Sequence, residues 1–144
     1  MILLQHESIA VRSITLESIA SITENNGIYI IEMPNFLQYL QFISAFTKKA
    51  NNFFKDACKI IENFCEAAKE LKNSVFYNVA GSLILPLLET SFDAHTDMIY
   101  TNVGVSTLMS IFETAQNESL SLEYIDLFLK SFEKFKKYED PEKR

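Results

Sequence analysis

The sequence predicts a mainly α-helical domain, and three observations carry that prediction. Apolar residues make up 48% of the 144 positions, enough to bury a hydrophobic core. Glycine and proline occur only three times each, which is low for an all-β fold and suits long helices. From Pro34 onward, apolar residues recur at the three- and four-residue spacing of one helix face. We therefore expect a single domain over 1–144, with a helical bundle over 34–139 and a frayed tail over 140–144.

Residues 1–33 lack that spacing and are expected to form a short β-hairpin. The apolar residues of 9–22 scatter around the axis of a helical wheel. Read as a strand, alternate positions from Ile14 to Ile22 are apolar except for Ser18, and residues 28–31 are β-branched or aromatic. Residues 25–27, Asn-Asn-Gly, are typical of a turn. The predicted hairpin pairs 14–23 with 28–33, and the alternative is a sixth, N-terminal helix over 7–23.

Five helices are expected after the hairpin, and the second is the clearest. The first begins near Pro34, a residue suited to the first turn of a helix, and is apolar on most sides. The second, over 53–71, has an apolar stripe opposite a face with charges of both signs. Cys58 and Cys65 lie in its stripe, about 10 Å apart along the axis, too far for a disulfide. We expect both thiols to be buried and reduced.

The other three helices carry recognisable start and stop signals. The third covers 75–88, and Pro86 predicts a kink or an early end, followed by a loop over 89–96. Thr96 or Asp97 is expected to cap the fourth helix, and Ser119 or Ser121 the last. The fourth has a face of small hydroxylic residues, which either packs under the N-terminal segment or contacts a partner or a second copy: Thr101, Ser106, Thr107 and Ser110.

Negative charge is concentrated in the second half of the chain. The net charge is −6, from 13 basic and 19 acidic residues. No Lys or Arg occurs between Lys72 and Lys130, whereas acidic residues recur throughout that interval. Such a stretch repels phosphate backbones, so nucleic-acid binding is not expected. We expect this half to dock a basic protein, and the predicted partner-binding residues are Glu89, Asp93, Glu113, Glu118, Glu123 and Asp126.

One short segment has the residue types of a catalytic or metal site. Asp93 and Asp97 flank His95, an arrangement that can bind a metal or shuttle a proton. In the simpler interpretation the two aspartates are turn and cap residues, because the only other histidine is His6. No glycine-rich phosphate loop or Gly-x-Ser-x-Gly elbow is present. We therefore expect neither an enzyme nor a bound cofactor or metal.

These observations favour a cytoplasmic protein-binding module that neutralises a toxin, acts as a chaperone or regulates its partner. No apolar run reaches the length of a membrane-spanning helix, and the first residues do not resemble a signal peptide, so no membrane attachment is expected. Two alternatives remain. One is a structural subunit that forms homodimers or larger homo-oligomers through surplus apolar surface. The other is a small enzyme or metal binder that uses the 93–97 loop.

Overall fold

The computed structural model describes residues 2–93, 95–114, 125–126, 129–130 and 133. Two short 3-10 turns, Ile2–Gln5 and Phe46–Lys48, accompany the helices of this part. The described part contains no strand, and its α-helices are α1 (Ile9–Ile30), α2 (Phe36–Ala45), α3 (Asn52–Leu71), α4 (Ser74–Ser91) and α5 (Met98–Thr114). The mainly helical class predicted from the sequence is confirmed. Most of the predicted last helix lies outside the described residues.

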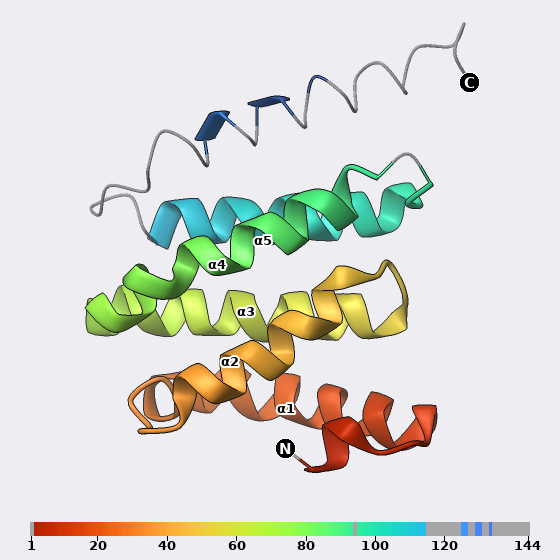
Figure 1. Cartoon of the computed structure of the whole chain (residues 1–144). Helices are drawn as coiled ribbons and strands as arrows, with labels where there is room; N and C mark the ends of the chain where they lie inside the picture. The colour runs from red at the N-terminus through yellow and green to blue at the C-terminus, as the bar shows by residue number, and fades with distance from the viewer. Residues whose placement is uncertain (1, 94, 115–124, 127–128, 131–132, 134–144) are drawn as a thin grey trace, which may run out of the picture.

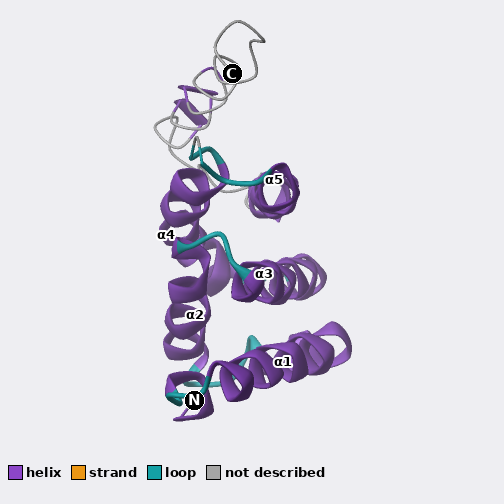
Figure 2. Ribbon diagram, turned by 90° about the vertical axis from the view of Figure 1, so that its right-hand side faces the viewer, coloured by secondary structure: helices purple, strands orange, loops and turns teal. Residues whose placement is uncertain are grey.

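The helices are arranged in two layers (Figures 1 and 2). Figure 2 shows α1, α3 and α5 side by side in one layer, with α2 and α4 in the other. Helix α3 is the middle member of its layer and contacts both α1 and α5. The core lies between the layers, where the ring of Phe36 from α2 meets Phe64 of α3 edge-on at 5.0 Å between centroids. Phe76 of α4 lies 6.3 Å from the same Phe36 ring and ties the second layer together.

The predicted N-terminal β-hairpin is wrong, because residues 9–30 form one continuous helix. Ser8 caps it, since its hydroxyl accepts a hydrogen bond from the backbone N–H of Val11 at 3.4 Å. Helix α1 buries one large residue and three small ones toward its neighbours, and this composition hides the helical period: Leu16, Ala20, Thr23 and Gly27. The alternative of an N-terminal helix is therefore correct, and the helix extends through the residues expected to form a turn.

Gly27 serves helix packing rather than a turn. A Cβ atom at this position would lie 3.3 Å from the Cβ of Ala67 and 3.3 Å from the carbonyl oxygen of Asn63, both on α3. The missing side chain therefore lets α1 and α3 approach closely. Asn63 fixes the same contact, because its side-chain amide donates to the carbonyl oxygen of Ala20 at 3.1 Å and to the hydroxyl of Thr23 at 3.0 Å.

Helix α4 continues through Pro86 to Ser91, so the predicted early end and the loop from residue 89 are wrong. Pro86 removes one backbone donor, but the turn that follows it is held by burial. Leu87 is fully buried and Leu88 is 3% exposed, and the backbone N–H of Phe92 closes the helix on the carbonyl of Leu88. Tertiary packing outweighs the local preference of proline here.

Side-chain caps begin α3, α4 and α5, and the predicted cap Asp97 is confirmed, whereas Ser119 and Ser121 lie outside the described residues. The side-chain oxygen of Asn51 accepts from the backbone N–H of Phe53 at 3.0 Å at the start of α3. Asn73 does the same for Phe76 at 2.8 Å at the start of α4. Asp97 accepts from Ile99 at 3.3 Å before α5. Each cap satisfies one of the backbone donors that a helix leaves free at its N-terminus.

Candidate functional site

The acidic residues predicted to bind a partner lie at two ends of the described structure. Helix α5 runs back antiparallel to α4, as Figure 1 shows. Glu89 is in the last turn of α4, and Asp93 follows it before α5 begins. Glu113 is in the last turn of α5, so the helix separates it from Asp93 by about 24 Å. Glu118 and Glu123 lie outside the described residues.

Two of the six acids already have cationic partners. A carboxylate oxygen of Glu113 lies 3.2 Å from the Nζ of Lys69, which belongs to α3, and this hydrogen bond is the main reason why the pKa of Lys69 is raised. Asp126 and Lys130 form a second pair at 2.7 Å. The interval between Lys72 and Lys130 contains no basic residue, but lysines from outside it lie next to two of its acidic residues in the folded chain. Among the described residues, Glu89 and Asp93 are in no ion pair.

The 93–97 loop uses its polar groups to hold its own backbone. A side-chain oxygen of Asp93 accepts from the backbone N–H of His95 at 2.8 Å, and Asp97 caps α5. The hydroxyl of Thr96 donates to the carbonyl of Thr90 at 2.7 Å, which ties the loop to the end of α4. Within the described ranges, no group of three or more His, Cys, Asp or Glu side chains is placed to hold a metal ion.

The hydroxylic face of α5 packs against α3 and not under the N-terminal segment. Thr107 is fully buried, and its hydroxyl lies 3.0 Å from a carboxylate oxygen of Glu62 on α3. Ser106 donates to the same oxygen at 3.1 Å. Helix α1 lies on the opposite side of α3 (Figure 2), which explains why it cannot cover α5. These hydroxyls therefore join two helices of one layer.

The two cysteines are buried where α3 faces α5. Both are free thiols, and burial raises the pKa of Cys58 and of Cys65 to about 12, although hydrogen bonds with Thr107 and Thr114 act in the opposite direction. A thiol with such a pKa is almost entirely protonated at neutral pH and is a poor nucleophile. The expectation that both cysteines are buried is confirmed.

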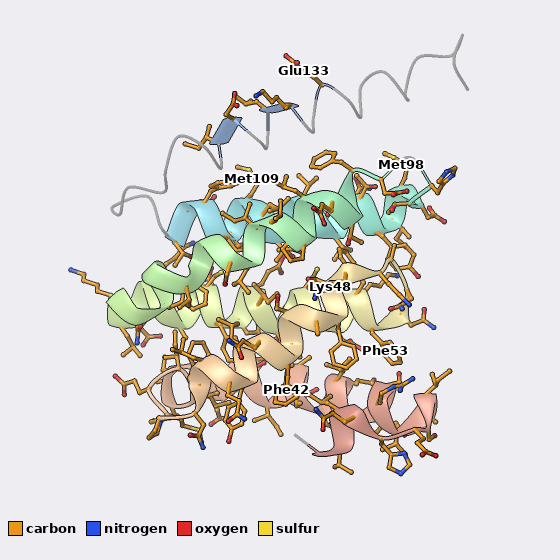
Figure 3. All side chains as sticks on the ribbon, in the orientation of Figure 1. Phe42, Lys48, Phe53, Met98, Met109 and Glu133 are labelled. Carbon is orange, nitrogen blue, oxygen red and sulfur yellow. The ribbon has the colours of Figure 1, made fainter. Side chains whose placement is uncertain are left out.

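A groove between α2 and α4, with a volume of about 410 Å³, is the feature that the sequence did not reveal. Leu37, Leu40 and Ala45 of α2 supply apolar lining, and Leu37 is 42% exposed. The facing helix contributes Val79, Ser82, Leu83 and Pro86. Lys48, labelled in Figure 3, stands at the end of the α2 side and is the one charged residue of the lining.

Pro86 interrupts the backbone hydrogen bonding of the α4 wall of the groove. Proline has no backbone N–H, so the carbonyl of Ser82 loses its usual helical donor, and both residues line the groove. The sequence shows Pro86 inside an apolar helical pattern. That Pro86 lies in the wall of a groove becomes visible only when the positions of α2 and α4 in space are known.

Comparisons of the chain with known protein families, curated proteins and solved structures found no match. Within the described part, no helix combines the length and apolar character needed to span a membrane. Function must therefore be inferred from the groove and from the charges around it.

Proposed function

We propose that this chain is a non-enzymatic protein-binding module. Its α2–α4 groove accepts an apolar segment of a basic protein partner, and Glu89 and Asp93 pair with Lys or Arg side chains of that segment. The observation that supports this proposal is the continuity of the groove wall on α4 with two exposed carboxylates that make no ion pair among the described residues.

Helical spacing places Glu89 on the groove side of α4. Ser82, Pro86 and Glu89 follow one another at four and then three residues, so they share one stripe of the helix. Glu89 therefore stands one turn beyond Pro86 and extends the groove wall with a negative charge. Asp93 follows another turn further along the chain and is also exposed.

The two kinds of contact have different tasks. Apolar lining contributes about 25 cal/mol for each square ångström removed from water, and this burial provides most of the affinity. Exposed carboxylates mainly accelerate the encounter with a cationic partner, an effect that salt screens. Lys48 on the α2 side repels a cationic partner, so a change of its charge tests whether the partner is basic. A toxin-neutralising, chaperone-like or regulatory binder would each use such a surface.

A display selection tests the groove directly. A random peptide library is panned against the immobilised chain, and enriched peptides are labelled and measured for binding kinetics with wild type and variants. We expect enriched peptides to combine apolar residues with Lys or Arg. Leu37→Glu should abolish their binding, because it puts a charge into the apolar wall.

The charge variants decide where the carboxylates act. Glu89→Lys should slow association by about tenfold at low salt, and Lys48→Glu should accelerate it. Glu113→Lys is the matched control, because it makes the same change of charge at the far end of α5. Equal losses for Glu89→Lys and Glu113→Lys, or enriched peptides without basic residues, would contradict the proposal.

A further inference from the structure

The outer face of α1 is uncovered by the rest of the described structure. This stripe consists of Ile14, Ser18, Ile22, Asn25 and Tyr29, which recur at three- and four-residue spacing opposite the face that packs on α3. Its three large side chains are 63%, 53% and 68% exposed, in the order Ile14, Ile22 and Tyr29. None of the five carries a charge, and the charged residues of α1 fall on its flanks.

Such a face is unusual for the edge helix of a layer. An edge helix normally divides into an apolar side and a charged side, whereas a helix that is apolar all round normally has neighbours on both sides. Helix α1 departs from the first pattern, because Leu16 and Ala20 point inward while the apolar Ile14 and Ile22 point outward. Large exposed apolar side chains aligned along one helix face are a candidate interaction site.

An apolar pocket adjoins the middle of the stripe. It has a volume of about 240 Å³ and is lined by residues of α1, α2, α3 and the segment between α1 and α2, which include Ile22, Met33, Tyr39 and Phe64. Met33 is 43% exposed at its rim. Because Ile22 belongs to both the stripe and the pocket, a helix lying along α1 could insert a large side chain there.

The stripe has the same pattern in both directions, which indicates what covers it. Reading outward from Ile22, each side has a small polar residue and then a large apolar one: Ser18 and Ile14 on one side, Asn25 and Tyr29 on the other. An antiparallel pairing of two α1 helices around a twofold axis at Ile22 therefore sets like residues against like. Small polar residues meet small ones, and large apolar residues meet large ones.

The distribution of charge on α1 is compatible with the same occupant. Each chain carries a net charge of −6, so two copies repel each other over most of their surface. An uncharged stripe is the place where they can meet without bringing carboxylates together. We propose that a second copy of this chain binds along α1 in an antiparallel arrangement centred on Ile22. This dimer uses a different face from the α2–α4 groove and does not depend on it.

Disulfide trapping tests the pairing and its register. Ile22→Cys places a thiol on the twofold axis, so mild oxidation should give a covalent dimer about tenfold or more faster than Glu17→Cys, a control on the flank of α1. The native thiols of Cys58 and Cys65 are buried and should not interfere. Both substituted positions are exposed, so the helix should fold normally in each variant.

A second pair of variants separates antiparallel from parallel helices. In the antiparallel pairing two copies of residue 18 lie about 12 Å apart along the axis, beyond disulfide reach, whereas residue 18 faces residue 25 of the second copy. Ser18→Cys alone should therefore form no covalent dimer on oxidation, and Ser18→Cys combined with Asn25→Cys should crosslink. Crosslinking of Ser18→Cys alone, or an Ile22→Cys rate no greater than that of Glu17→Cys, would overturn the proposal.

Discussion

Helix α3 lies between α1 and α5, whereas α1 stands at the edge of the same layer with α3 on one side (Figure 2). The middle helix buries nine residues and the edge helix four. A middle helix is expected to be apolar on two sides and an edge helix on one. The sequences show the opposite, because α3 has sharply divided apolar and charged faces, whereas α1 has apolar residues on both its inner and its outer side. The difference is the basis for our proposal that a second copy of the chain binds along the outer face of α1.

The largest expected effect on stability comes from comparing a fully buried position of α3 with an exposed position of α1. Phe54 of α3 is fully buried, and its ring lies 6.1 Å from that of Tyr100. Phe54→Ala should lower the free energy of unfolding by about 3–5 kcal/mol, because it removes buried contacts and leaves a cavity. Ile14→Ala on the outer face of α1 should change the stability of the monomer by less than about 0.5 kcal/mol. Urea unfolding at low protein concentration measures both, and similar losses would show that the outer stripe is covered within the monomer.

An intermediate effect is expected where the two helices meet. Asn63→Ala removes both side-chain hydrogen bonds from α3 to α1 and should lower the free energy of unfolding by about 1–2 kcal/mol. Asn25→Ala, on the outer stripe, is the matched control and should cost almost nothing in the monomer. Thermal unfolding monitored by circular dichroism compares the two variants. A loss at Asn25 as large as that at Asn63 would remove the distinction between the inner and outer faces of α1.

The smallest expected effect is on the pH dependence of stability, and it concerns the side of α3 that α5 covers. The raised pKa of Cys58 and Cys65 means that the unfolded chain loses thiol protons at lower pH than the folded chain. The contribution of the two thiols to the free energy of unfolding is therefore constant at pH values below the ordinary thiol pKa. The free energy of unfolding then falls as the pH rises from that value toward the folded-state pKa of about 12. Between pH 7.5 and 9 the loss should be about 1 kcal/mol for the two thiols together. Urea titrations at several pH values measure it, and a double Cys→Ala variant should give a flatter profile. An unchanged profile would place the thiols in contact with solvent.

Sequence periodicity was sufficient for α3, because its large apolar residues and its charged residues fall on separate faces. The same reasoning failed for α1, where three of the four buried residues are small and the outer face is as apolar as the inner one. Asn25, Asn26 and Gly27 resembled a turn, yet Gly27 is used for close contact between helices. Local sequence cannot distinguish these two uses of glycine, because the deciding neighbour, Ala67, is forty residues away.

The candidate site was predictable only in part. Glu89 and Asp93 were identified from the sequence and are exposed, whereas Glu113 meets Lys69 through packing that the order of residues does not reveal. The α2–α4 groove requires two helices that are separated by α3 in the chain. Its apolar residues look like ordinary core positions until the helices are placed in space.

Sedimentation equilibrium of the wild-type chain and of Ile22→Glu, over a range of concentrations at low and high salt, tests the role of α1 most directly. The wild type should form a dimer that salt leaves intact or strengthens, because screening reduces repulsion between two chains of net charge −6. Ile22→Glu should stay monomeric under the same conditions, because two carboxylates would meet at the twofold axis. A wild-type chain that is monomeric at every concentration, or a dimer that Ile22→Glu leaves unchanged, would contradict the assignment of the outer face of α1 to a second copy.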